Sequence, residues 1–473
     1  MEEFDLTIIG GGVGGLVAAS GASQFGAKVA LVEKENLGGD CLHYGCVPTK
    51  TLVHSARLIS LMRRATEFGL NPVTVDFEFK KIMEHMREVQ KKVGEHDDPK
   101  RFEKMGIKLF FGKGGFKDTR TFEVNGTNIK SRKFLIATGS RPVKLPIPGL
   151  DKVDSLDNIK ILAINHLPES ILIMGAGPIG MEFAQVFSRF GSKVTVIEKA
   201  GQILPREEKE LSDRLEGILK REGMEIITCV ETKRVEQSGN KRIVVAECSG
   251  KEKRFEADEL LVAIGRAPNI EGMNLEKIGV KTTSKGIVVN DTMKTTVSNI
   301  WACGDVTGMF PFTHMAEYEA GIVIGNALFP FVNRKMDKTV VPWTTFTDPE
   351  LARVGLTEDE ARKEYGDIRV YRYPFSEHDR AIIDGETEGM IKLICDKKGK
   401  ILGAHILGKG AGDLLNEYTF AMKNGLPVQK ISQTVHVYPT MGQVVKRGAD
   451  QYYKERLFSG WFPKVARFLM KFK

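Results

Sequence analysis

The stretch Leu6-Thr7-Ile8-Ile9-Gly10-Gly11-Gly12-Val13-Gly14-Gly15-Leu16-Val17-Ala18-Ala19 decides the fold. An apolar run typical of a strand leads into a glycine-rich turn, and a run typical of a helix follows it. The glycines Gly10, Gly12 and Gly15 let the backbone approach a pyrophosphate at the N-terminus of that helix. The next apolar run, residues 28–32, ends at Glu33, which is placed to hold a ribose hydroxyl. This order of elements predicts a dinucleotide-binding unit of the Rossmann type.

A second fingerprint of the same kind, Gly175-Ala176-Gly177-Pro178-Ile179-Gly180, follows the apolar residues 171–174. The strand predicted after it, residues 193–197, ends at Glu198. A carboxylate at this place accepts a hydrogen bond from a free 2′-hydroxyl and repels a 2′-phosphate, which favours NAD over NADP. Lys199 is adjacent and could soften that preference, so NADP stays possible.

Two cysteines, Cys41 and Cys46, lie between the two fingerprints in the run from Gly38 to Lys50. Taken alone they would more often be structural thiols or a plain disulfide. Beside two dinucleotide units they predict a redox dithiol that relays electrons. The other four cysteines are scattered without CxxC spacing, so we interpret them as structural and expect no metal site: Cys229, Cys248, Cys303 and Cys395.

With these features the chain resembles the FAD-dependent pyridine nucleotide–disulfide oxidoreductases, which include dihydrolipoamide dehydrogenase, glutathione reductase and mercuric reductase. The resemblance extends to about residue 455, and further family-like motifs are Ala137-Thr138-Gly139-Ser140, Ala263-Ile264-Gly265-Arg266-Ala267-Pro268-Asn269 and Ala302-Cys303-Gly304-Asp305. It implies an α/β fold with two Rossmann-type domains, for FAD and NAD, and a C-terminal α+β dimerisation domain. It also implies a homodimer and a small-molecule or protein disulfide or dithiol as substrate.

The resemblance also implies roles for single residues. Cys46 lies against the flavin as the thiolate, and Cys41 is the outer thiol that exchanges with substrate. Lys50 lies near the flavin N5 and pairs with Glu182, while Asp305 holds the ribityl chain. The cofactor-binding residues implied are Gly10, Gly12, Gly15, Glu33, Lys34, Gly39, Asp40, Lys50, Gly115, Thr138, Gly139, Ser140, Asp305, Gly175, Gly177, Gly180, Glu198 and Gly265.

Length and composition agree with several globular domains. The chain has 473 residues, 42% of them hydrophobic and 27% charged. Its net charge of +8 is not gathered into a basic arm, so we expect no nucleic-acid partner. No apolar run approaches the length of a membrane span and no signal peptide precedes the first strand, which predicts a cytoplasmic protein.

The pattern along the chain predicts five segments. A proline-rich linker at residues 146–149 and the change of character after about residue 340 set the main boundaries. Residues 390–395 and 401–407 predict an antiparallel hairpin in the last domain. The expected segments are FAD domain 1–147, NAD(P) domain 148–270, second FAD part 271–338, interface domain 339–456 and a basic amphipathic tail 457–473.

The C-terminal domain departs from the disulfide reductases in the family. These enzymes have a histidine before Pro-Thr, followed by a glutamate, as the acid–base dyad. Here Tyr438 precedes Pro439-Thr440, and Gln443 stands in place of the glutamate. Tyrosine, with an ordinary pKa of about 10, is a poor base at neutral pH. His436, two positions upstream, is the alternative if its loop presents it.

Three functions therefore stay open. The first is an NAD(P)H- and FAD-dependent disulfide reductase, favoured by both cysteines and Glu198. The second is a mercuric reductase-like metal-ion reductase, favoured by Tyr438 and weakened because no cysteine follows Cys395. The third is a flavoprotein electron donor to a quinone or partner protein, with the dithiol vestigial or regulatory.

The predicted tail also has a pattern of its own. In residues 461–473 the apolar positions 461, 465, 468, 469 and 472 alternate with Lys464, Arg467, Lys471 and Lys473, which predicts a short basic amphipathic helix. Such a helix either packs on the dimer or makes a weak contact with an anionic membrane, which would place the protein at the inner face of the membrane.

Overall fold

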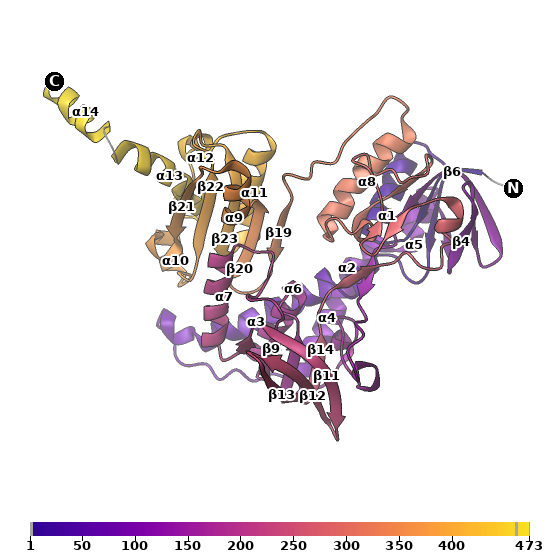
Figure 1. Ribbon diagram of the computed structural model, residues 1–473, viewed down its shortest axis with the longest axis horizontal. Helices are drawn as coiled ribbons and strands as arrows, with labels where there is room; N and C mark the ends of the chain where they lie inside the picture. The colour runs from indigo at the N-terminus through magenta and orange to yellow at the C-terminus, as the bar shows by residue number, and fades with distance from the viewer. Residues whose placement is uncertain (1–2, 459–461, 473) are drawn as a thin grey trace.

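The computed structural model of the chain describes residues 3–458 and 462–472 (Figure 1). Its first sheet has seven strands in the order β3-β2-β1-β6-β5-β4, with β18 beside β6. Strands β1, β2, β3, β6 and β18 are parallel, and β4 and β5 complete the sheet as antiparallel strands. Their bounds are β1 Glu3–Ile9, β2 Val29–Glu33, β3 Lys108–Phe111, β4 Gly114–Asp118, β5 Thr121–Val124, β6 Thr127–Ile136 and β18 Ile300–Ala302.

Helices α1 (Val13–Gln24) and α8 (Thr313–Leu328) pack on each other against this sheet, although almost 300 residues separate them. Strands β1 and β2 are buried on both faces, which explains why they are nearly continuous apolar runs. Small elements complete the domain: α2 Gly39–His43, α5 Pro99–Lys104, β7 Ser140–Pro142, β15 Arg266–Pro268, β16 Thr282–Thr283 and β17 Gly286–Ile287.

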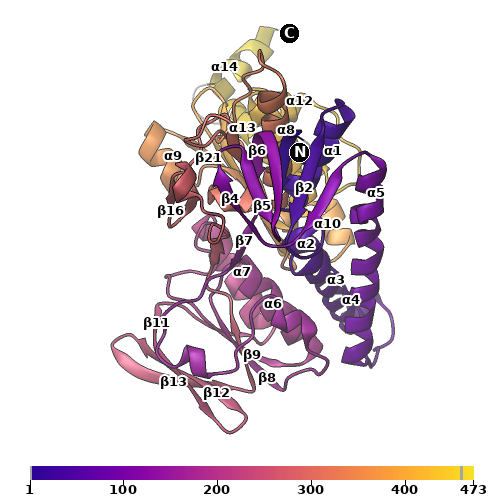
Figure 2. The ribbon, with the colours of Figure 1, turned by 90° about the vertical axis from the view of Figure 1, so that its right-hand side faces the viewer.

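A pair of long helices, α3 (Cys46–Arg63) and α4 (Phe79–Gly94), runs from the first domain down to the second (Figure 2). The apolar side chains of α3 and α4 share one core with those of α6 (Pro178–Phe190). Phe79, for example, lies 5.9 Å from Phe190, ring centre to ring centre. Burial of this core holds the start of α3, and hence Cys46, at a fixed place relative to the second dinucleotide unit.

The second domain has a four-stranded parallel sheet in the order β10-β9-β8-β14 and a three-stranded antiparallel sheet β11-β12-β13. Both predicted Rossmann-type units are thereby confirmed. The bounds are β8 Ser170–Met174, β9 Lys193–Ile197, α7 Lys209–Arg221, β10 Glu225–Ile227, β11 Val230–Ser238, β12 Lys241–Cys248, β13 Lys251–Ala257 and β14 Glu259–Val262.

The C-terminal domain is built on a five-stranded antiparallel sheet in the order β19-β20-β23-β22-β21, as expected for an α+β unit. The predicted hairpin is β22 and β23. The bounds are β19 Pro342–Thr345, β20 Glu350–Gly355, α9 Glu358–Tyr365, β21 Arg369–Pro374, α10 Asp379–Ile383, β22 Met390–Cys395, β23 Ile401–Gly408, α11 Ala411–Lys423, α12 Val428–Gln433 and α13 Gln443–Phe458.

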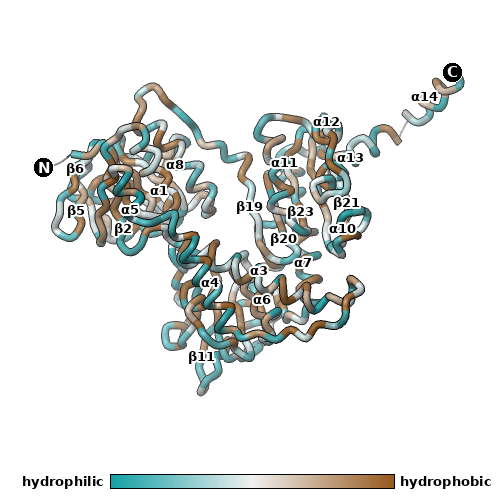
Figure 3. Tube along the Cα trace, turned by 180° about the vertical axis from the view of Figure 1, so that it is seen from behind, coloured by the Kyte–Doolittle hydropathy of each residue, from teal (hydrophilic) through white to brown (hydrophobic). Residues whose placement is uncertain are grey.

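The chain ends in α14 (Phe462–Leu469) and a short 3₁₀ turn, which extend away from the three domains (Figures 1 and 3). Helix α13 continues through residues 456 and 457, where the sequence suggested a boundary. Of the predicted tail, residues 459–461 and 473 lie outside the described residues. No helix within the described residues is long and apolar enough to cross a membrane.

Candidate active site

One cavity of about 2700 Å³ joins both glycine-rich turns and the dithiol. Gly10, Gly12 and Glu33 line it from the first domain, and Gly175, Gly177 and Glu198 line it from the second. Cys41 and Cys46 lie in its wall with Lys50 and Glu182. Residues that are far apart in the sequence therefore surround one continuous space.

The two glycine-rich turns have matching geometry. Gly10 and Gly175 both adopt a left-handed conformation, with φ of +110° and +102°. A Cβ atom at Gly10 would overlap the carbonyl oxygen of Ala137, and one at Gly175 would lie 2.5 Å from that of Ala263. Only glycine fits these two positions. Gly12 and Gly177 then form the N-caps of α1 and α6, where free N–H groups favour an anion.

The acid at the end of each second strand is held by backbone amides. Glu33 accepts hydrogen bonds from the N–H groups of Gly11 (2.6 Å) and Glu35 (2.9 Å). Glu198 accepts them from Ala176 and Ala200, both at 2.7 Å. These bonds fix each carboxylate on the cavity wall. Lys34, beside the first acid, pairs with Glu35 at 3.5 Å.

The dithiol spans the junction of α2 and α3, and both cysteines carry free thiols. The Cys41 S–H donates to the Cys46 sulfur, and this hydrogen bond lowers the pKa of Cys46 to about 6 although burial opposes it. The hydroxyl of Thr313, 3.5 Å from the Cys46 sulfur, and the charge of Lys50 lower the pKa of Cys46 further. The same Cys41–Cys46 hydrogen bond, together with burial, raises the pKa of Cys41 well above its ordinary range. The pair therefore holds one proton at neutral pH, with Cys46 as the thiolate.

Lys50 and Glu182 form the ion pair that the resemblance implied. The Lys50 ammonium nitrogen lies 2.7 Å from a Glu182 carboxylate oxygen, and the Glu182 side chain is only 6% exposed. The other Glu182 oxygen accepts the N–H of Phe346, whose ring centre is 4.7 Å from the Lys50 nitrogen. Lys50 is one helical turn beyond Cys46 on α3, so the pair lies on the same side of the cavity as the thiolate.

A second polar cluster surrounds Asp305. The Ser140 hydroxyl donates to Asp305 at 2.6 Å, and Arg266 donates to the same hydroxyl at 2.8 Å. Arg266 also pairs with Asp40 at 3.1 Å. Burial raises the pKa of Asp305 above its usual range, although Ser140 and Arg266 oppose the shift. This cluster connects the start of α2, the end of the first sheet and the crossing strands β7 and β15.

The remaining predicted glycines differ in position. Gly39 packs on Gly12, since a Cβ at residue 39 would lie 2.7 Å from the Gly12 Cα. Gly15 and Gly180 lie behind their turns in helices α1 and α6, and Thr138, Gly139 and Gly265 line the cavity. Gly112 and Gly114 line the cavity beside Gly115, which is paired with Glu123 in the β4–β5 hairpin, and the contact of Gly115 with a cofactor stays a prediction.

Tyr438 and His436 lie outside the cavity of their own chain. The Tyr438 hydroxyl donates to Asp379 at 3.0 Å, and this bond raises the pKa of Tyr438. His436 has its Nε2 3.0 Å from both oxygens of Glu417 and its Nδ1 3.0 Å from the Thr434 carbonyl oxygen. Both ring nitrogens of His436 therefore face acceptors of the same chain.

Sequence reasoning missed Thr313, Phe346 and Arg266 as site residues. Thr313 and Phe346 carry no local motif: the fold brings Thr313 to Cys46, 267 residues away, and Phe346 to Glu182, 164 residues away. Arg266 lies within a recognised motif, but its two partners Asp40 and Ser140 are distant in sequence. In the described part of the chain no group of three or more His, Cys, Asp or Glu side chains could hold a metal ion.

Comparison with known proteins decides the family. Residues 4–320 match the family model described as pyridine nucleotide-disulphide oxidoreductase, and residues 341–449 match the dimerisation domain of the same family. The chain belongs to the pyridine nucleotide-disulphide oxidoreductases. This family uses FAD and pyridine nucleotides, so the predicted cofactors, FAD and NAD(P)H, and the predicted oxidoreductase class are confirmed.

Several relatives of this oxidoreductase cover almost its whole length. A mercuric reductase of Staphylococcus aureus is 36% identical over 455 residues, which are 96% of this chain and 83% of that protein. A dihydrolipoyl dehydrogenase of Bacillus subtilis is 35% identical over 464 residues, 94% of this chain and 97% of that protein. The structure is also similar to that of RclA, an HOCl-induced flavoprotein disulfide reductase of Escherichia coli, with a TM-score of 0.85 and 31% identity over 94% of this chain and 99% of RclA.

The residues of the cavity fit the family's cofactors. The contact of Gly12 with Gly39 leaves only backbone at the N-terminus of α1, so a pyrophosphate can approach there. The fixed carboxylates of Glu33 and Glu198 each lie one strand away, where the ribose of a dinucleotide is held. A bound FAD would supply two-electron transfer between the nicotinamide and a disulfide in this cavity.

Proposed function

We propose that this oxidoreductase uses Cys41 and Cys46 as a redox dithiol that reduces a disulfide substrate with electrons from NAD(P)H, as a dihydrolipoyl dehydrogenase-like enzyme. The observation that carries the proposal is the place of Cys41 and Cys46 in the wall of the cavity that joins both glycine-rich turns, beside the Lys50–Glu182 ion pair. Cys46 is stabilised as a thiolate, while the more basic Cys41 keeps its proton. Cys41 would attack one sulfur of the substrate disulfide as its proton passes to the sulfur that leaves, which gives a mixed disulfide and the first substrate thiol. The Cys46 thiolate would then attack the Cys41 sulfur and release the second substrate sulfur as a thiolate, as the Cys41–Cys46 disulfide forms.

The chain's own charged residues support these roles. Lys50 would stabilise the Cys46 thiolate and, with Glu182 as its fixed partner, provide a positive charge beside the reacting end of both cofactors. Glu33, Ser140 and Asp305 would hold the FAD, and Gly177 the nicotinamide dinucleotide. Glu198 favours NAD over NADP, because its charge repels a 2′-phosphate.

The proposal includes a homodimer. The C-terminal domain is the dimerisation domain of the family. Val435 and Val437, on either side of His436, are 92% and 74% exposed in the single chain, and exposed apolar side chains of this kind suit an interface. A partner covering this segment would bring Tyr438 or His436 close to the other chain's dithiol, where Tyr438 would act as a hydrogen-bond donor rather than as a base.

The test is steady-state oxidation of NADH and NADPH by the holoenzyme with lipoamide and other small disulfides as acceptors. The proposal predicts turnover that is lost in Cys41→Ser and in Cys46→Ser and kept in Cys248→Ser, a matched change outside the cavity. Turnover that survives both active-site changes would reject it and would favour direct electron donation to a quinone or partner protein.

A second candidate acceptor is a thiophilic metal ion such as Hg(II) or Cu(II). It is favoured by the exposed Cys46 thiolate beside Cys41 and by Tyr438 in place of the dyad histidine. Relatives support it, since mercuric reductases are among them and RclA has been solved as a Cu(II) complex. Metal-dependent oxidation of NADH without disulfide turnover would select this candidate.

We also propose that the tail contacts an anionic membrane surface. In α14 and the turn after it, Val465, Phe468, Leu469 and Met470 are 38 to 66% exposed, and Lys464, Arg467 and Lys471 supply positive charge. The helix extends away from the domains, so a lipid surface can reach it (Figure 1). Binding to vesicles with and without anionic lipid tests this part.

A further inference from the structure

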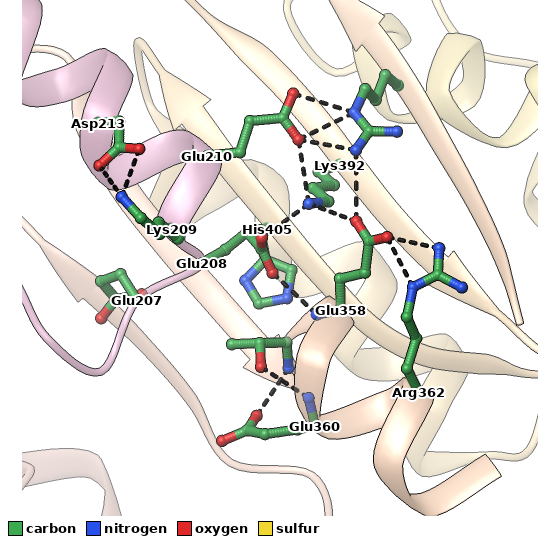
Figure 4. Close-up of polar contacts among 12 residues, drawn as sticks. Glu207, Glu208, Lys209, Glu210, Asp213, Glu358, Glu360, Arg362, Lys392 and His405 are labelled. Atoms are coloured by element: carbon green, nitrogen blue, oxygen red, sulfur yellow. Dashed lines mark hydrogen bonds and ion pairs between the residues drawn. The ribbon is translucent and has the colours of Figure 1, made fainter. Parts of the chain in front are cut away.

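The loop before α7 connects the second domain to the C-terminal domain through a buried lysine. Lys392 of β22 is 3% exposed and lies 2.7 Å from Glu208, 3.0 Å from Glu210 and 2.8 Å from Glu358. Figure 4 shows Glu208 and Glu210 directed toward Lys392, whereas Glu207 lies apart from this cluster. The ion pairs of Lys392 with Glu208 and Glu210 hold the start of α7 against the C-terminal domain, and Glu207, the residue before them, lines the cavity.

Glu207 is buried, and its carboxylate has one hydrogen-bond partner among the described residues. It accepts the indole N–H of Trp343 at 2.5 Å, while its second carboxylate oxygen is buried without a hydrogen bond. Arg353 stacks on the Trp343 ring at 4.9 Å from its centre. Burying a carboxyl group without a hydrogen bond costs free energy, so Glu207 keeps its bond to the Trp343 indole. The ion pairs of Lys392 hold the neighbouring residues of Glu207 in place, and the position of the Trp343 ring is thereby fixed.

Trp343 and its neighbour Pro342 brace the segment that contacts the thiolate. The Trp343 ring is stacked on Phe312, with centres 5.6 Å apart and planes 14° apart. The Nε2 of His314 contacts the Pro342 carbonyl oxygen at 2.8 Å. Thr313, between these two braced residues, places its hydroxyl 3.5 Å from the Cys46 sulfur.

We infer that Trp343, held by Glu207, is a positioning residue for the Cys46 thiolate. It acts through Phe312 and Thr313, because both neighbours of Thr313 are held by Pro342 and Trp343. The inference rests on the proposed role of Cys46 and extends it to residues that touch neither sulfur. It connects the loop of the nicotinamide-binding domain with the thiolate through the Glu207–Trp343 hydrogen bond of 2.5 Å, the Trp343–Phe312 stack with ring centres 5.6 Å apart, and the Thr313–Cys46 contact of 3.5 Å.

The experiment is the pH profile of Cys46 alkylation by iodoacetamide in reduced holoenzyme, measured by mass spectrometry. Thr313→Val, Trp343→Phe and Glu207→Leu should each move the midpoint upward by roughly half to one pH unit, the effect of one weakened hydrogen bond. Glu207→Gln keeps an acceptor for the indole N–H, so its midpoint should stay close to that of the wild type. Trp301→Phe is the matched control, because the indole N–H of Trp301 has no partner in the described residues.

A double substitution decides whether the residues act together. Adding Glu207→Leu to Thr313→Val should shift the midpoint no further, because the contact of the Thr313 hydroxyl with Cys46, which Glu207 helps to position, is already absent. An unshifted midpoint in both Trp343→Phe and Glu207→Leu, with a shift in Thr313→Val, would overturn the inference while leaving the dithiol proposal intact. Disulfide turnover that survives Cys46→Ser would instead reject the proposed function.

FAD content and Tm of each variant identify any that misfold, and Glu207→Gln and Trp343→Phe are conservative enough to carry the test.

Discussion

At the residue scale, the chemistry of the site depends on the single negative charge of Cys46. Three groups stabilise that charge: the Cys41 S–H, the Thr313 hydroxyl and the Lys50 ammonium. Each comes from a different place in the chain, so the thiolate reports on the assembly of the whole site. In the reduced enzyme, alkylation of Cys46 should therefore follow pH with a midpoint of about 6, with the thiolate lost as the pH falls below that value.

The measurement is the rate of Cys46 labelling against pH, with the exposed Cys229 of the same chain as internal control for the reagent. The labelling rate should already be at its plateau at neutral pH. A midpoint close to the ordinary value of about 8.5 would contradict the stabilised thiolate.

Removing the charge of Lys50 and removing that of Glu182 should shift the pKa of Cys46 in opposite directions. Lys50 lowers the pKa of Cys46 and Glu182 raises it, since one brings positive and the other negative charge. Lys50→Met should move the midpoint of Cys46 labelling upward, and Glu182→Gln should move it downward, each by roughly half a unit or more. Shifts of the same sign would mean that the substitutions act through general disturbance of the cavity.

At the element scale, two glycines of the second strand–turn–helix unit have different roles. Gly175 is required for the stability of the domain, and Gly177 for binding of the dinucleotide. Gly175 is left-handed and closely packed, so Gly175→Ala should destabilise the second domain by roughly 2–4 kcal/mol. Gly177, the N-cap of α6, has φ of −74° and no atom near its missing Cβ. Gly177→Ala should keep the Tm and weaken NADH binding about tenfold or more, equal to ~1.4 kcal/mol, because the methyl group lies where the pyrophosphate approaches. Differential scanning fluorimetry and titration with NADH measure the two effects, and equal losses of Tm in both variants would contradict this division.

The same elements explain what could be predicted from the sequence. Strand, turn, helix and terminal acid are local in sequence, so both Rossmann-type units and the hairpin of β22 and β23 were recognisable. Thr313 and Trp343 were not, because their contacts with Cys46 and Glu207 join residues 267 and 136 positions apart and follow no fixed spacing.

At the scale of the whole molecule, three domains enclose one cavity and a terminal helix stands apart from them. Helix α14 contacts α13 and the turn that follows it, and its apolar side chains remain largely exposed. Apolar burial and three basic residues, each worth about 1 kcal/mol near an anionic surface, would give weak binding that depends on salt.

Deletion of residues 462–473 should therefore abolish co-sedimentation with vesicles that contain anionic lipid, without changing turnover of soluble acceptors. Two matched variants separate the causes. Lys464→Gln with Arg467→Gln and Lys471→Gln should remove the dependence on anionic lipid and on salt, whereas Val465→Ser with Phe468→Ser and Leu469→Ser should weaken binding at every salt concentration, because apolar burial is not screened. If the deletion leaves vesicle binding unchanged and instead lowers the dimer fraction in sedimentation velocity, the helix packs on the dimer, and the membrane proposal is wrong.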